Sequence, residues 1–147
     1  MCSSMKDERK IRLAEGRPEH VDVVVPLICQ TSHRFFSFLY DNRPEVRDAI
    51  IAASWKAAVS IFSHKFSTVA YSDDKVVGVL IGYEATVKKE QEIAMRRVAS
   101  PFADEALRQH MASSKAILLN KSPQVPDDAY YVTIISVSEE AQGSGVG

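Results

Sequence analysis

The C-terminal part of the chain consists of an apolar, β-rich run followed by a glycine-rich segment. Residues 131–137 read YVTIISV, an acidic turn follows, and residues 142–147 read QGSGVG. β-branched and aromatic residues favour a strand, and glycine allows positive φ and close approach of a ligand to the backbone. Successive backbone N–H groups can hold a phosphate, although glycine and serine are also typical of surface turns. The pattern predicts a buried strand leading into an anion-binding loop or an ordinary turn.

Two nucleotide-binding patterns fit this segment poorly. A P-loop needs Lys-Ser/Thr after its second glycine, and no such pair is present. The dinucleotide pattern needs glycines at positions 143, 145 and 148, and the sequence ends at Gly147. Its loop also follows the strand at once, whereas residues 138–142 lie between the strand and the first glycine here. A nucleotide-binding protein of another fold therefore remains only a distant alternative.

A third pattern fits better. The segment resembles the acetyl-CoA motif of the GNAT superfamily of acyl-CoA N-acyltransferases, Gln/Arg-x-x-Gly-x-Gly/Ala, which it matches at Gln142, Gly145 and Gly147. It departs mildly from the family in having Ser138-Glu139 and Ala141 where Asp-Pro and an aromatic residue are frequent. The resemblance implies an α/β fold with a mixed, mostly antiparallel sheet flanked by helices. It also implies transfer of an acetyl group from acetyl-CoA to an amine, without a metal.

The resemblance also assigns binding roles. In the family, the strand before the motif offers unpaired backbone groups to the pantetheine amides, and the matching positions are Ile135 and Val137. One strand N–H would polarise the thioester carbonyl. The amides of the following segment would hold the pyrophosphate; these residues are Gln142, Gly143, Ser144, Gly145, Val146 and Gly147.

No catalytic residue is identified from the sequence. The acceptor amine must lose a proton, because an alkyl ammonium has a pKa near ~10.4. The candidates beside the central strands are Tyr83, Glu84, Thr133 and Ser136, of which we retain Glu84 and Ser136, although a strand-end Glu is more often simply solvated. Thr133 and Ser136 are expected on opposite faces, because their separation is odd. The resemblance puts an acceptor pocket near His33, Phe36 and Tyr40, for which packing is the plainer role.

Composition limits the classes of partner. With 18 basic and 19 acidic residues the net charge is −1, which gives no electrostatic reason to expect nucleic acid or an anionic membrane as partner. The partner expected is a small-molecule or peptide amine, and a homodimer stays open. The first residues lack a signal-peptide core, and Cys2 and Cys29 suggest neither a disulfide framework nor a metal site. We expect a cytoplasmic protein and read Cys29 as packing.

The rest of the chain predicts alternating strands and helices. Residues 1–9 are expected to be a disordered tail, and residues 10–147 one partial GNAT-type domain. We expect a strand over 10–14, a helix over 19–40 that is kinked or divided at Pro26, and a helix capped by Asn42 that runs to about Ser63. A hairpin follows over 66–83. Residues 86–119 read as a helical insertion broken at Ser100-Pro101, with a Glu92–Arg96 pair, and 121–128 as a loop.

Family members continue past this motif with a helix and further strands. The resemblance therefore implies a domain truncated after its fourth strand, and we expect the 147 residues to belong to a longer protein and to bind acetyl-CoA poorly alone. A remainder present as a separate or cleaved piece, and a truncated chain that has lost activity, stay open as alternatives. The main alternative function is a non-catalytic acyl-CoA-sensing or interaction module on the same scaffold. The sequence does not identify the acceptor.

Overall fold

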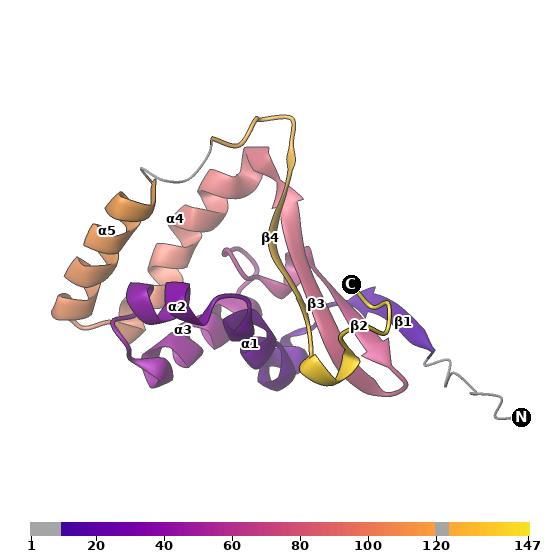
Figure 1. Cartoon of the computed structure of the whole chain (residues 1–147). Coiled ribbons are helices and arrows are strands. Elements are labelled where there is room, and N and C mark those ends of the chain that lie inside the picture. The colour runs from indigo at the N-terminus through magenta and orange to yellow at the C-terminus, as the bar shows by residue number, and fades with distance from the viewer. Residues whose placement is uncertain (1–9, 120–123) are drawn as a thin grey trace, which may run out of the picture.

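The computed structural model describes residues 10–119 and 124–147, which form an α/β structure built on one antiparallel sheet. Its strands follow one another in chain order (Figure 1), namely β1 (Ile11–Glu15), β2 (Ser67–Ser72), β3 (Lys75–Glu84) and β4 (Tyr130–Val137). The four predicted strands are therefore confirmed. The expected disordered tail lies outside the described residues, as does part of the expected loop at 121–128.

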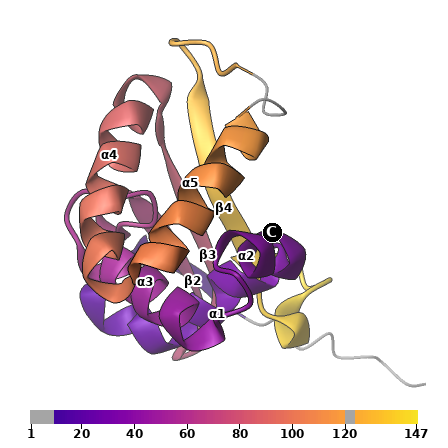
Figure 2. The same ribbon diagram turned by 90° about the vertical axis from the view of Figure 1, so that its left-hand side faces the viewer.

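The helices cover one face of this sheet. They are α1 (Val21–Gln30), α2 (His33–Leu39), α3 (Pro44–Lys56), α4 (Lys88–Ala99) and α5 (Glu105–Leu119). Helix α1 packs against β3 and β4, α3 packs against α1 and α4, and α5 lies outermost beside α2. Figure 2 shows the helices in front of the sheet. No helix within the described ranges is both long and apolar enough to cross a bilayer.

The two faces of the sheet differ sharply in exposure. Val69, Val79 and Ile81 point toward the helices and are buried in the main core. Residues that alternate with these along the strands point to the other face of the sheet. On that face Leu13 of β1 is 66% exposed and Ile135 of β4 is 57% exposed. Among the described residues, only the segment after β4 folds over this second face (Figure 1). The sheet thus presents an open apolar face beside β4.

The hairpin of β2 and β3 forms as the sequence predicts. Ser72 pairs with Lys75, so the loop contains two residues, and Asp73 adopts φ 53° there. Short polar residues tolerate this left-handed conformation better than most. Near the turn the register changes by one residue, because Ala70 pairs with Gly78 but Tyr71 pairs with Val76, which leaves a bulge.

The first predicted helix divides at a different place from that expected. Pro26 lies inside α1, which continues to Gln30. The division falls at Ser32, whose side chain accepts a hydrogen bond from the Phe35 N–H and so begins α2. Proline removes a single hydrogen bond, and the packing of α1 on the sheet tolerates that loss. A new N-cap therefore sets the boundary.

The next helix differs at both ends. Arg43 rather than Asn42 is the N-cap of α3, with Pro44 in the first turn and no side-chain capping bond. The helix ends at Lys56, well before Ser63. Beyond it the Ser60 hydroxyl donates to the Ser54 carbonyl at 2.6 Å. This buried hydrogen bond satisfies a carbonyl near the C-terminus of α3, so the chain can leave the helix after Lys56.

The helical segment at 86–119 is confirmed as α4 and α5, separated by a short 3-10 turn at Ser100–Phe102. Asp104 caps the second helix, because its carboxylate accepts from the Leu107 N–H at 2.8 Å. The ion pair on α4 joins Glu92 to Lys88 at 2.6 Å, rather than to Arg96 as expected.

Candidate functional site

The outer edge of β4 presents backbone groups that β3 does not use. The Ser138 N–H donates to the Val77 carbonyl at 2.8 Å, and residues in an antiparallel pair alternate between facing the partner and facing away. With the register of β3 and β4, Ile134 and Ser136 face β3, whereas the N–H and C=O groups of Ile135 and Val137 face outward. An extended amide-containing ligand could therefore pair with these two residues.

The glycine segment follows this edge as an open turn. Gly143 and Gly145 adopt φ 80° and 86°, a region that residues with a Cβ rarely occupy. A Cβ built at either position would meet no atom within 4 Å. In the described part of the chain, the N–H groups of Gly143, Gly145 and Val146 donate to no backbone carbonyl. The segment thus combines unused donors with free space around them.

Beyond this turn the segment folds back over the sheet. Val146 packs against the small cluster of Ala70, Val77 and Ala141. A cavity of about 290 Å³ lies between Val146 and the exposed face of the sheet, where Leu80 and Ile135 line it. The end of the segment, at Val146 and Gly147, therefore lies against a mostly apolar cavity.

The side chains around the turn carry mostly negative charge. Glu139 and Glu140 are exposed at its start, and Lys75 pairs with Glu140 at 3.2 Å. An exposed pair of this kind contributes little to stability. An anion held here would depend on backbone donors, since the nearby carboxylates oppose it.

Gln30, at the end of α1, is part of the site although nothing in the sequence singled it out. Its Nε2 donates to the Ser136 hydroxyl at 2.8 Å and to the Val137 carbonyl at 2.7 Å. The Gln142 side chain donates to the same carbonyl at 3.0 Å. The Val137 carbonyl is therefore already satisfied, whereas the outward groups of Ile135 are not paired with protein in the described ranges.

Replacing Gln30 by alanine should lower the free energy of unfolding by about 1–3 kcal/mol, because two part-buried hydrogen bonds are lost. Urea denaturation followed by circular dichroism measures the change. Gln109→Ala is a matched control, since the Gln109 side chain bonds to the exposed Glu105, and should change little. Equal effects of the two substitutions would contradict the role of Gln30 in tying α1 to β4.

An irregularity in β4 changes the expected positions of two candidate side chains. Ile81 pairs with Ile134 but Gly82 pairs with Val132, so Thr133 is an extra residue in a bulge. A bulge interrupts the alternation of faces, and the prediction that Thr133 and Ser136 lie on opposite faces is therefore wrong. Both hydroxyls are turned from the open face, since Ser136 is buried beside Gln30 and Thr133 lies by Tyr83.

Tyr83 and Thr133 form a polar spot at this bulge. Burial raises the pKa of the Tyr83 hydroxyl, and the Thr133 hydroxyl opposes part of that rise. The two groups nevertheless do not meet the geometry of a hydrogen bond, and Thr133 Oγ1 is buried without a partner among the described residues. Bulges often lie next to active sites. The sequence marks both residues as candidates but does not place them together.

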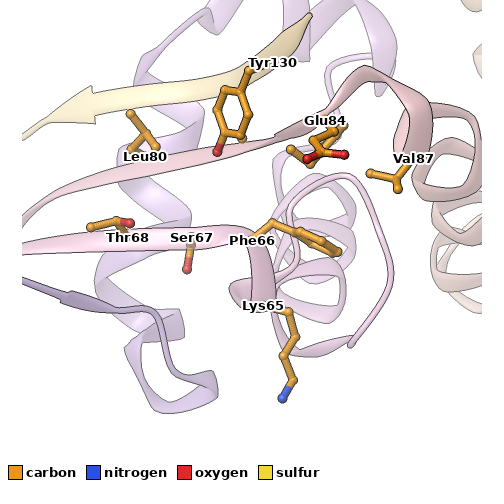
Figure 3. A pocket seen from close by; sticks show the side chains of 10 residues that line it. Lys65, Phe66, Ser67, Thr68, Leu80, Glu84, Val87 and Tyr130 are labelled. Atoms are coloured by element: carbon orange, nitrogen blue, oxygen red, sulfur yellow. The ribbon is translucent and has the colours of Figure 1, made fainter. Parts of the chain in front are cut away.

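Glu84 lies at the opposite end of the sheet from the glycine segment. It is paired in register with Tyr130, the first residue of β4, so seven residues or roughly 24 Å of strand separate it from Val137. There Glu84 lines a cavity of about 420 Å³ together with Tyr130 and Thr68. Figure 3 shows the Tyr130 ring over the sheet and Lys65 directed away from Glu84. The structure does not bring Glu84 and Ser136 together.

The aromatic residues expected near an acceptor belong mainly to the core. Phe36 and Tyr40 are 3% and 2% exposed and stack on one another, and burial raises the pKa of Tyr40 far above its usual range. Both also line a cavity of about 250 Å³ beside Arg43. His33 is exposed at the start of α2 and does not line that cavity.

The other histidines and the cysteine have structural contacts. His20 bonds to the Tyr71 hydroxyl at 2.6 Å, and His64 to the Trp55 carbonyl at 2.6 Å. His110 bonds to the Phe38 carbonyl at 2.5 Å. Cys29 is buried, and burial raises the pKa of its thiol to about 11. Within residues 10–119 and 124–147, no group of His, Cys, Asp and Glu is arranged to hold a metal.

Comparison with known proteins gives the fold. No family model and no curated protein matches the chain. A crystal structure of an acetyltransferase superposes with a TM-score of 0.68 at 16% identity, covering 92% of this chain and 67% of that one. An N-acetyltransferase from Staphylococcus aureus Mu50 gives 0.69 at 18% identity, covering 92% and 69%. The chain has the fold of these acetyltransferases, so the predicted α/β fold, a mostly antiparallel sheet flanked by helices, is confirmed.

Proposed function

We propose that the chain binds acetyl-CoA along the outer edge of β4 and belongs to an acetyl-CoA-dependent N-acetyltransferase acting on an amine. One observation carries the proposal. Outward backbone groups of Ile135 and Val137 are followed, after the short turn at Glu139–Ala141, by unused N–H donors at two positive-φ glycines. A pantetheine arm offers amides to the first set of groups, and a diphosphate accepts from the second.

The contacts along the strand can be specified further. The Val137 carbonyl already accepts from Gln30 and Gln142, and a carbonyl oxygen has two lone pairs. The pantetheine amides would therefore pair with both groups of Ile135 and with the Val137 N–H. Movement of the Gln142 side chain would release the remaining carbonyl. Gln30 would then act as a positioning residue that holds β4 against α1.

The chemistry requires an uncharged amine and a stabilised oxyanion. The amine nitrogen attacks the thioester carbonyl, the C–S bond breaks, and the leaving thiolate takes up a proton. An outward backbone N–H of β4 that the pantetheine amides leave free is a suitable donor to the oxyanion, and loss of one such donor costs about 3 kcal/mol in other enzymes. The ammonium proton must go elsewhere first, because its pKa is near ~10.4.

The acceptor is proposed to approach β4 near the Thr133 bulge. The cavity beside Glu84 is also lined by Tyr83, whose side chain lies by Thr133 at the bulge. Glu84 is exposed at a strand end, so it is a better candidate than Ser136 for accepting a proton from an amine that arrives from solvent. Ser136 is buried and bonded to Gln30, which makes it a poor candidate.

The direct test is release of free CoA by the full-length gene product incubated with acetyl-CoA and a panel of amines. We expect thiol release that depends on at least one small-molecule or peptide amine. Competition by ATP or NAD but not by CoA would contradict the proposal and favour a nucleotide-binding protein. The same assay with Glu84→Gln tests the role of this carboxylate. If Glu84 accepts the proton, the pH dependence of CoA release should shift; if Glu84 is merely solvated, it should not change.

A non-catalytic acyl-CoA sensor is the second candidate, favoured by one observation. Neither Glu84 nor a free Ser136 hydroxyl lies at the outward edge of β4 where the thioester would sit. Saturable binding of acetyl-CoA without amine-dependent thiol release across the whole panel would support the sensor. Turnover with any acceptor excludes it.

A further inference from the structure

A second cavity lies between α4 and α5, apart from the β4 edge. It has a volume of about 500 Å³, within the range of small-molecule sites. Its floor consists of the buried apolar residues Ala99, Ala103 and Met111. Ala112 and Ala116 form a wall along α5. Small side chains facing one another along two helices leave this space unfilled.

The rim of this cavity carries only positive charge. Arg96 lies on α4, and Arg108 and Lys115 lie on α5 about 10 Å apart along the helix. Arg108 is engaged, since it donates to the Ser100 carbonyl at 3.0 Å and lies 3.7 Å from Glu105. In the described part of the chain, Arg96 and Lys115 have no ion-pair partner.

These two cations lie close enough to repel one another. Burial lowers the pKa of the half-buried Lys115 ammonium, and the positive charge of Arg96 lowers it further. Glu92 acts in the opposite direction, but its carboxylate is paired with Lys88 at 2.6 Å. Arg96 and Lys115 are therefore left with uncompensated positive charge beside the apolar floor of the cavity.

We propose that this cavity binds an amphipathic organic anion of the fatty-acid type. Its carboxylate would lie between Arg96 and Lys115, and its hydrocarbon chain would lie over Ala99, Ala103 and Met111. Charge complementarity selects the anionic head, because an anion relieves the repulsion between the two cations. The alanine- and methionine-lined hollow selects an apolar body, because polar groups there would lose their hydrogen bonds to water.

A free small molecule fits these features better than a macromolecule. The chain has a net charge of −1, which gives no electrostatic reason to expect nucleic acid as the partner. The unpaired cations instead line a single cavity. The proposal is independent of acetyl-CoA binding, because the cavity shares no residue with β4 or the glycine segment.

Isothermal titration of the full-length protein with decanoate tests the proposal, with decan-1-ol as the uncharged comparison. We expect saturable binding of decanoate and roughly tenfold weaker binding after Lys115→Met, since a charge-assisted contact is lost. Methionine keeps most of the apolar stem of lysine, so the fold should persist. Ala112→Trp should fill the cavity and remove binding.

Arg96→Met and Arg97→Met form a matched pair on α4. Both residues are exposed neighbours, but only Arg96 lines the cavity. We expect Arg96→Met to weaken decanoate binding roughly tenfold and Arg97→Met to leave it unchanged. Absence of saturable decanoate binding, or equal binding by wild type and the Arg96→Met/Lys115→Met double variant, overturns the proposal.

Vesicles containing an anionic phospholipid distinguish a free ligand from a membrane surface. Sedimentation with such vesicles that depends on Arg96 and Lys115, without decanoate binding, would assign the cations to a lipid surface and overturn the small-molecule site. Binding of decanoate and decan-1-ol with equal affinity would likewise contradict a role for the two charges.

Discussion

Trp55→Ala should lower the free energy of unfolding by about 3–5 kcal/mol, the usual range for removing a large buried aromatic residue. Trp55 is fully buried in α3, and its indole N–H donates to the Arg17 carbonyl at 2.9 Å. A Cβ on Gly16 would lie only 2.8 Å from its ring, so the surrounding chain is packed tightly and cannot easily collapse into the space. Such a loss is a large part of the total stability of a typical domain.

Urea denaturation followed by circular dichroism measures this change, since Trp55 is the only tryptophan and its fluorescence disappears with it. Trp55→Phe keeps most of the ring volume but removes the N–H, and should cost less than the alanine variant. Ile117→Ala is the surface control, because Ile117 is 50% exposed, and should change stability by less than about 0.5 kcal/mol. Similar losses for Ile117→Ala and Trp55→Ala would show that Trp55 does not organise the core.

The strands were predictable because their signals are local. The run at 75–83 is rich in valine and follows a polar turn, and it forms β3 almost as expected. The same holds for β4, whose aromatic and β-branched residues favour a strand over a helix. Burial on one face and exposure on the other then follows from the alternation of side chains.

The helix ends were harder to predict because contacts distant in sequence decide them. The apolar pattern of α3 continues through Ala57 and Ile61, which predicts a longer helix. The chain instead leaves the helix after Lys56, and the hydroxyl of Ser60 bonds to Ser54 in the buried interior. The sequence pattern around a serine does not differ between an exposed serine and one whose hydroxyl donates to a helix carbonyl.

In the candidate site, the sequence predicted the segments that offer backbone groups but not the side chain that supports them. The glycine segment and the outward residues of β4 follow from a contiguous stretch of sequence. Gln30 is 107 residues from Val137, and a glutamine at a helix end is ordinarily solvated, so no local signal marked it. The bulge at Thr133 likewise depends on how β3 and β4 pair, which composition does not reveal.

Gly145→Val should weaken acetyl-CoA binding by the full-length gene product by about tenfold to a hundredfold, which corresponds to the loss of one hydrogen bond to a charged group, about 1.5–3 kcal/mol. Gly145 has φ 86°, and its Cβ would point into open space rather than into protein. The added side chain would therefore meet the ligand instead of a neighbour. Thermal stability should fall as well, because valine is strained at this positive φ even though no existing contact is broken.

Gly145→Asn separates the two ways in which the valine could act. Asparagine tolerates positive φ far better than valine, yet it also carries a Cβ. If the side chain blocks the diphosphate, Asn and Val should weaken acetyl-CoA binding alike, as measured by calorimetric titration. If backbone strain alone is responsible, the Asn variant should bind nearly as well as wild type. Unchanged binding in both variants would show that the amides around Gly145 do not hold the ligand, because a Cβ at that position leaves no room for a phosphate in contact with them.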